Sequence, residues 1–249
     1  MASGPVETKN MAAPPDALSP TTTRQSRVRE REATIITAAR SVFSIHGYAK
    51  ATMAMIAREA GVADGTLYTY FENKDALARG VISDFYARLT RSAEAGVETR
   101  RTTRTRLDFL ARNHMNSILE ERGIIEMLPL MTSEISQYSN SDIYELNKTY
   151  VAVFDEVIRE GRASGDIAGD ADVASLRDIF FGSLDYGYKS LLMRTARGSA
   201  RKADTARLID QLVGMILGSS GSSRGSHAER LDSIVDRLET VLQTISKKK

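Results

Sequence analysis

The chain has 249 residues, of which 42% are hydrophobic and 27% are charged, and this length accommodates one large domain or two modest ones. Cysteine is absent, which excludes a disulfide framework, a thiolate metal site and a cysteine nucleophile. The sequence lacks the apolar core of a secretory signal and any apolar run of about 20 residues. We therefore expect a globular, cytoplasmic protein that is neither exported nor inserted into a membrane.

The formal net charge of +2 is unevenly distributed. Between residues 24 and 74, eight basic side chains stand against five acidic ones, and the rest of the chain carries no positive excess. Four of the five prolines lie within the first 20 residues, and a body poor in proline favours helices. We expect a disordered arm over residues 1–27, an all-helical body, and a basic N-terminal region that by itself is also typical of a solvated helix face.

Apolar residues at three- and four-residue spacing predict a first helix from Glu30 to Ile45, which Gly47 ends. Thr52 is a candidate N-cap for a short second helix, and Gly61 can end that helix in a left-handed conformation. Another short helix over residues 64–70 follows at once. Two short helices joined by a tight, glycine-containing turn are the layout of a helix-turn-helix, and the second of them fits the major groove of DNA.

The run from Phe43 to Leu77 contains T-M-x-x-I-A-x-x-A-G-V, followed by G-T-L-Y-x-Y-F and a lysine. With these motifs in order and without gaps, the run resembles the DNA-binding domain of the tetracycline-repressor (TetR) family of bacterial transcription regulators. The resemblance implies a helix-turn-helix domain over residues 28–74, a larger helical domain for effector binding and dimerisation over residues 75–218, and a homodimer on operator DNA.

The resemblance implies two kinds of DNA contact, to the backbone and to the bases. Backbone contacts fall to the helix N-terminus capped by Thr52 and to Tyr68, Tyr70 and Lys74. Base reading falls to Asp64, Gly65, Thr66 and Thr69. The sequence departs from the family at Ala63 and Asp64, where serine and often lysine are common. Asp64 either favours the helix dipole or accepts a hydrogen bond from cytosine, and solvated or core positions are the alternatives for the lysine and the tyrosines.

Arginines precede the first predicted helix, at positions 24, 27, 29 and 31. On a flexible arm, Arg24, Arg27, Arg29 and Arg31 could reach phosphates or an adjacent minor groove. The alternative is a set of isolated arginines in a disordered leader.

The body is expected to be helical at residues 102–122, 124–138, 142–163, 171–195 and 202–218, with glycines as breaks. Methionines and aromatic residues are frequent in part of it, and such side chains line ligand cavities as well as ordinary bundle cores. The candidate pocket residues are Phe85, His114, Met115, Met127, Met131, Tyr144, Tyr150 and Phe154.

The predicted helix around residues 179–193 is apolar on much of its circumference and carries small residues at helical spacing, which suits a subunit interface. By resemblance it would pair with its copy as part of a four-helix dimer bundle. The candidate interface residues are Phe180, Ser183, Leu184, Gly187, Leu191, Leu212 and Ile216. The segment D-I-F-F-G-S-L, residues 178–184, resembles the subgroup that senses long-chain acyl-CoA. Composition and spacing predict a flexible linker over residues 219–226 and a C-terminal amphipathic helix over residues 227–249.

Three function classes remain to be compared. The expected function is a ligand-responsive transcription regulator, a homodimeric repressor that a fatty acyl-CoA or another apolar or amphipathic effector releases from a palindromic operator. An architectural DNA-binding protein without an effector is the alternative, and a roomy cavity in the body would distinguish the two. A helical enzyme is the third class, but the three histidines are far apart and neither an H-E-x-x-H nor a P-loop pattern occurs. We expect no catalytic site, no cofactor and no metal.

Overall fold

The computed structural model describes residues 20–121, 123–125, 127, 141–198 and 202–218. Every regular element in this part of the chain is a helix, which confirms the predicted all-α class. None of these helices is both long and apolar enough to cross a bilayer. The predicted linker 219–226 and C-terminal helix 227–249 lie outside the described residues. In chain order the helices are α1 (Pro20–Lys50), α2 (Met53–Ala60), α3 (Asp64–Tyr70), α4 (Lys74–Glu98), α5 (Thr103–Glu120), α8 (Asp142–Ser164), α9 (Val173–Ala196) and α10 (Lys202–Gly218).

The first helix starts earlier than the sequence pattern predicted. α1 begins at Pro20, so the expected disordered arm over residues 1–27 is wrong from Pro20 onward, and residues 1–19 lie outside the described part. Proline is favoured in the first turn of a helix because its fixed φ suits the helix and its missing N–H has no partner there. No glycine or proline follows before Gly47, where φ is 72° and the helix is interrupted. That interruption confirms the predicted stop.

Short polar side chains fix where five of the helices begin. Each accepts a hydrogen bond from the backbone N–H three residues later, which satisfies one of the free amides of the first turn. The pairs are Thr52 with Met55, Asn73 with Ala76, Thr102 with Thr105, Ser141 with Tyr144, and Asp172 with Ser175. Because these caps are local in sequence, the predicted starts of these helices agree closely with the structure.

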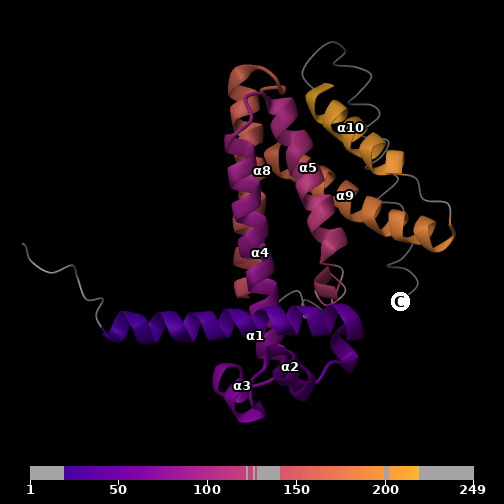
Figure 1. Ribbon diagram of the computed structural model, residues 1–249. Helices are drawn as coiled ribbons and strands as arrows, with labels where there is room; N and C mark the ends of the chain where they lie inside the picture. Colours follow the sequence, from indigo (N-terminus) through magenta and orange to yellow (C-terminus); the bar gives the residue numbers. More distant parts are fainter. Residues whose placement is uncertain (1–19, 122, 126, 128–140, 199–201, 219–249) are drawn as a thin grey trace, which may run out of the picture.

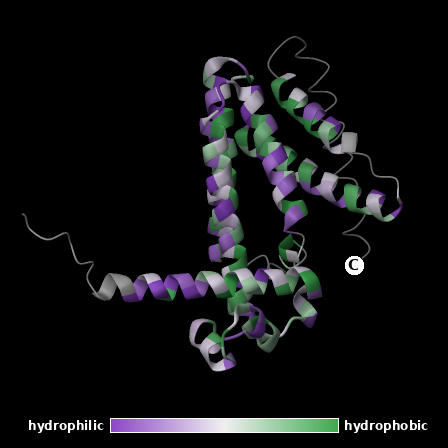
Figure 2. Cartoon of the chain, in the orientation of Figure 1, coloured by the Kyte–Doolittle hydropathy of each residue, from purple (hydrophilic) through white to green (hydrophobic). Residues whose placement is uncertain are grey.

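Two parts of the molecule share the long helix α4 (Figure 1). α1, α2 and α3 gather around the first turns of α4, whereas α5 and α8 pack along the rest of it. α9 packs on α5, α8 and α10. Figure 2 shows hydrophilic residues over the first half of α1 and apolar residues where α1 crosses α4. The buried residues of the two parts form one continuous core.

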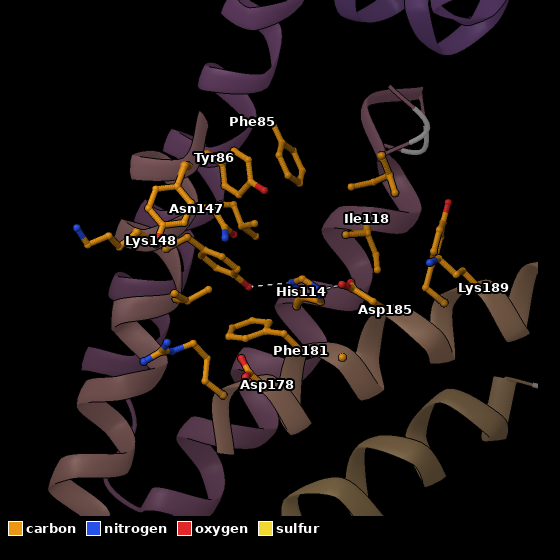
Figure 3. A pocket seen from close by; sticks show the side chains of 18 residues that line it. Phe85, Tyr86, His114, Ile118, Asn147, Lys148, Asp178, Phe181, Asp185 and Lys189 are labelled. Atoms are coloured by element: carbon orange, nitrogen blue, oxygen red, sulfur yellow. Dashed lines mark hydrogen bonds and ion pairs between the residues drawn. The ribbon is translucent and has the colours of Figure 1, made fainter. Parts of the chain in front are cut away.

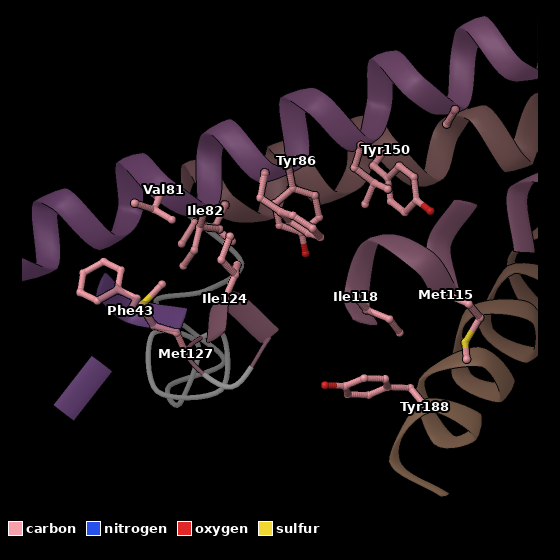
Figure 4. Packing of buried hydrophobic residues seen from close by; sticks show 14 of the residues in the cluster. Phe43, Val81, Ile82, Tyr86, Met115, Ile118, Ile124, Met127, Tyr150 and Tyr188 are labelled. Carbon is pink, nitrogen blue, oxygen red and sulfur yellow. The ribbon is translucent and has the colours of Figure 1, made fainter. Parts of the chain in front are cut away.

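The segment after α5 joins the two parts directly. Figure 4 shows Ile124 and Met127 beside Phe43 of α1 and Ile82 of α4, and all four side chains are buried. Gly123 lies against the α1 backbone so closely that a Cβ atom there would stand 2.8 Å from the Cα of Ser44. The backbone of α1 therefore contacts the backbone of the segment after α5 at this point.

An ion bridge reinforces the same junction. The Glu121 carboxylate lies 3.2 Å from Arg40 of α1 and 3.0 Å from Arg88 of α4. Arg88 also binds Asp84, at 2.8 Å. Since these groups are only partly exposed, the bridge is screened less than an ordinary surface pair. We call the set Arg40, Arg88, Glu121 and Gly123 the junction.

We expect Gly123→Ala to destabilise the protein by about 1–3 kcal/mol, the usual range for overpacking, because the added methyl group meets backbone atoms that cannot rotate away. Gly169→Ala is the control, since nothing lies within 4 Å of a Cβ atom there. Thermal or urea unfolding measures both. Equal stability of the two variants would contradict the close approach at Gly123.

Candidate nucleic-acid interface and ligand cavity

The turn between α2 and α3 is built by one residue with a left-handed backbone. Gly61 has φ 64° and ψ 36°, a conformation that glycine adopts without steric cost. Its N–H donates to the Arg58 carbonyl at 3.2 Å, and the N–H of Val62 donates to the Ala57 carbonyl at 3.0 Å. Leu67 then anchors α3 and is completely buried. The tight turn and this single anchor leave the rest of α3 facing outward.

The outer face of α3 carries small and polar groups. Asp64, Gly65, Thr66, Tyr68 and Thr69 are exposed and Tyr70 is half-buried, with Tyr68 at 53% exposure. The Thr69 hydroxyl donates to the Gly65 carbonyl at 3.0 Å. A side chain at position 65 would meet no atom within 4 Å, and its φ is not left-handed. The fold therefore does not require glycine at this position, whereas close approach of a partner would.

Lys74 has partners within the protein. Its ammonium donates to the carbonyls of Tyr48 at 3.0 Å and Ala51 at 3.2 Å, and it lies 4.5 Å from the centre of the Tyr48 ring. Burial and a hydrogen bond to Asp75 raise the pKa of Tyr48 to about 12. Lys74 thus stabilises the carbonyl end of α1, a role for which the sequence alone gave no signal.

A cavity of about 620 Å³ lies in the body between α4, α5, α8 and α9. Figure 3 shows Phe85, Tyr86 and Phe181 around it, with Lys148 and Lys189 on opposite sides. Its lining is Phe85, Tyr86, Leu89, His114, Ile118, Ile125, Tyr144, Asn147, Lys148, Tyr150, Val151, Arg177, Asp178, Phe181, Gly182, Asp185, Tyr188 and Lys189. The mixture of aromatic rings and a few polar groups is typical of a small-molecule site.

A hydrogen-bonded chain crosses the wall of this cavity. His114 Nε2 lies 3.2 Å from Asp185 Oδ1, and His114 Nδ1 lies 3.0 Å from the Tyr150 hydroxyl (Figure 3). Because a carboxylate only accepts, Nε2 carries the proton in the neutral ring and Nδ1 accepts from Tyr150. Burial raises the pKa of Tyr150, so this hydroxyl remains protonated. The chain ties α5, α8 and α9 together beside the ligand space.

Two family profiles match adjacent stretches of this sequence. The profile of bacterial regulatory proteins of the tetR family matches residues 35–81, and that of the C-terminal region of YsiA-like proteins matches residues 85–218, more than half of the chain. The chain belongs to the tetR family of bacterial regulatory proteins. It is a DNA-binding transcription regulator, and its relatives are regulators rather than enzymes.

The relatives of this regulator include proteins of fatty acid metabolism. It is 28% identical over 151 residues to the fatty acid metabolism regulator protein of Bacillus subtilis, covering 61% of this chain and 78% of that protein. The fatty acid degradation regulator FadR of Bacillus halodurans has a TM-score of 0.63 and 26% identity, with 78% of this chain and 96% of that one covered. FadR of Bacillus subtilis in complex with stearoyl-CoA has a TM-score of 0.63 and 24% identity, with 75% and 98% covered. The chain is thus similar to regulators of fatty acid metabolism and degradation.

The regulator's cavity contains half of the predicted pocket residues. Phe85, His114, Tyr144 and Tyr150 line it, and Met131 lies outside the described residues. The other three do not line this cavity. Phe154 is buried against the Phe180 ring, 4.6 Å away, Met127 is buried at the junction, and Met115 faces a separate space of about 340 Å³ beside α9 and α10. Helical spacing shows that a residue is buried, but not which neighbouring space it faces.

Sequence reasoning missed most of the α9 wall of this regulator's cavity. Asp178, Phe181, Gly182 and Asp185 line it, and together they occupy one helix face. Two carboxylates seven residues apart on a largely apolar helix are the signal that could have revealed this face, because charged side chains avoid an ordinary core.

Four of the seven predicted dimer contacts are inaccessible in the single subunit, and the other three stay predictions. Phe180, Leu184, Leu212 and Ile216 are all buried within the single subunit, so they are not surface contacts. The small residue Gly187 lets Leu208 of α10 approach within the same subunit, and Ser183 and Leu191 border the smaller space there. Within the subunit, the close helix packing that the small residues indicate is made with α10.

We expect Gly65→Ala to leave the free protein as stable or up to about 1 kcal/mol more stable, yet to lower DNA affinity at least about tenfold if the DNA backbone or a base approaches this position. Gly61→Ala is the matched variant, because its positive φ makes any side chain costly and the fold should lose stability. Thermal unfolding and fluorescence anisotropy on DNA separate the two effects. If Gly65→Ala bound DNA as tightly as the wild type, the prediction that DNA closely approaches α3 at this position would be wrong.

Proposed function

We propose that this regulator is a homodimeric repressor that an apolar or amphipathic effector, a fatty acyl-CoA, releases from a palindromic operator. The observation that carries the proposal is the arrangement of α4. Phe85, Tyr86 and Leu89 of this helix line the cavity, and its first turn follows directly on the DNA-reading unit. A ligand that fits the cavity better when α4 is displaced would lower operator affinity by its difference in affinity between the two states.

The lining supports an acyl chain with a polar head. Aromatic and aliphatic side chains supply apolar area, and the exposed Lys189 can meet an anionic head group at the rim. Lys148 can do the same in exchange for its exposed ion pair with Glu145, at 3.3 Å. Arg177, by contrast, is held by Asp155 through two hydrogen bonds of 2.8 and 2.7 Å. The stearoyl-CoA complex of a structural neighbour adds support.

The cavity also favours a sensor over an architectural protein. A protein that only shapes DNA could pack its body solid, because it has no need of a space of about 620 Å³. Such a sensor acts on the chromosome, so we place it in the cytoplasm of a bacterial cell.

Exposed apolar residues support dimerisation through α9 and α10. Tyr186, Met193 and Met215 are 70%, 54% and 56% exposed, and burial against a second copy would cover them. A two-fold dimer of this kind places its two α3 helices about 34–36 Å apart, in successive major grooves. In each half-site, Asp64, Gly65, Thr66 and Thr69 face the bases. Tyr68, Tyr70 and the α2 N-terminus at Thr52 meet the backbone, and Lys74 contributes positive charge from the start of α4.

The proposal is tested by selecting genomic fragments that bind the purified protein and then titrating the complex with palmitoyl- or stearoyl-CoA. We expect acyl-CoA to lower operator affinity at least about tenfold, and free CoA to have no effect. Gly182→Trp should abolish the acyl-CoA response without changing operator affinity, because position 182 lines the cavity and a Cβ atom there meets nothing within 4 Å. Ala174→Trp, at an exposed position of α9 outside the lining, is the control. An acyl-CoA response that survives in Gly182→Trp would exclude the cavity as its site.

The junction offers a second route from the cavity to α1, because Ile118 and Ile125 line the cavity on either side of Glu121. We expect Glu121→Gln to weaken the bonds to Arg40 and Arg88 and to reduce the effect of acyl-CoA on operator affinity several-fold. Glu120→Gln, at an exposed neighbouring position, serves as the control. Titration of each variant with effector measures the coupling, and wild-type coupling in Glu121→Gln would rule out this route.

A further inference from the structure

We propose that the first turns of α1 form a second DNA contact, in which Arg24, Arg27 and Arg31 bind backbone phosphates that flank the half-site read by α3. We call these three residues the arginine stripe. The proposal rests on the proposed operator binding and adds a surface that lies outside the helix-turn-helix.

The stripe stands on a helix segment that leaves the body. Residues 24–31 are all exposed, and the first completely buried residue of α1 is Ile35. Figure 1 shows this half of α1 extending sideways beyond α4, at the end of the molecule that carries α2 and α3. At 1.5 Å per residue, Arg24 lies roughly 16 Å farther out than Ile35.

The register of α1 orients the stripe. Spacings of three, four and seven residues place side chains on one helix face, and the steps from Arg24 to Arg27, Arg31 and Ile35 follow this pattern. Continuing inward, the same face carries Ala39 and the other buried residues with which α1 packs on α2 and α4. The stripe therefore lies on the side of α1 toward the helix-turn-helix, whereas Arg29 points away from it.

This face of α1 is apolar where it packs on the body and positively charged where the helix extends beyond the body. Within the described residues, Arg24, Arg27 and Arg31 have no ion-pair partner. Glu30 stands three residues from Arg27 and Glu32 follows Arg31, so a carboxylate flanks the stripe on each side. Like charges three and four residues apart destabilise a helix, and a helix segment without tertiary contacts is marginal. A polyanion along this face removes that repulsion.

DNA is the polyanion that the arrangement favours. The stripe and the exposed face of α3 belong to one packed unit, so DNA bound by α3 brings a row of phosphates close to α1. Arginine forms strong, often bidentate hydrogen bonds with phosphate. Phosphates carry no sequence information, so the stripe should add affinity and salt dependence rather than base preference.

The test compares Arg27→Gln/Arg31→Gln with Arg29→Gln/Arg101→Gln, which removes the same charge from exposed positions off the stripe. Operator affinity is measured by anisotropy between about 50 and 200 mM salt, on a duplex limited to the two half-sites and on one with about five further base pairs at each end. We expect the stripe variant to lose about tenfold in affinity on the longer duplex, with a salt slope lower by about two. It should match the wild type on the short duplex, and the control should stay within about twofold of the wild type on both.

Equal losses in the two double variants, or an unchanged salt slope in the stripe variant, would overturn the second contact. Circular dichroism of each variant shows whether α1 remains helical. If the wild type favours no DNA sequence, the proposed repressor function fails instead, and the same salt slopes on random duplex DNA still decide the role of the stripe.

Discussion

The backbone contact between Gly123 and α1 is the constraint on which the arrangement of this protein depends. Only a residue without a side chain allows the segment after α5 to lie against Ser44. Because this segment is so close, Ile124 and Met127 fill the core shared with Phe43, and Glu121 reaches Arg40. The DNA-reading unit is therefore held at two places, through α4 and through the junction, and it cannot swing freely about one helix.

Because of this double attachment, a ligand in the cavity can change the position of the DNA-reading unit. The ligand space borders α4 on one side and the residues around Glu121 on another, so a ligand that spreads these walls acts on both attachments at once. Closely packed interfaces shift between discrete arrangements rather than deforming continuously. Allosteric couplings are typically worth about 1–3 kcal/mol, and loss of the Glu121 bonds or of tight packing at Gly123 is of this order.

The sequence predicted the helix-turn-helix well because its determinants are local. The Thr52 cap, the Gly61 turn, the Leu67 anchor and the Asn73 cap fall within a short stretch, and each acts through neighbours a few residues away. The cavity was predicted only in part. Tyr150 and Phe154 lie one turn apart on α8 and both pack on Phe181, yet only Tyr150 lines the cavity. Which of the two residues lines the cavity depends on where α5 and α9 pack, and helical spacing in the sequence gives no information about that packing.

Two further features became clear only in the folded structure. The small residue at Gly187 indicates close helix packing in the sequence, but only the structure shows that Leu208 of the same chain fills the space. The arm over residues 1–27 is expected to be disordered because four of the five prolines lie within its first 20 residues. α1 begins at Pro20 nonetheless, and the absence of a core there leaves the arginines exposed.

Calorimetry of effector binding, with and without operator DNA, tests the central claim most directly. Linkage requires the effector to lose affinity for the DNA-bound protein by the same factor by which it weakens DNA binding. We predict that acyl-CoA binds the operator complex at least about tenfold more weakly than it binds the free protein. Equal affinity for the free and the DNA-bound protein would contradict the claim that the cavity and α3 are coupled.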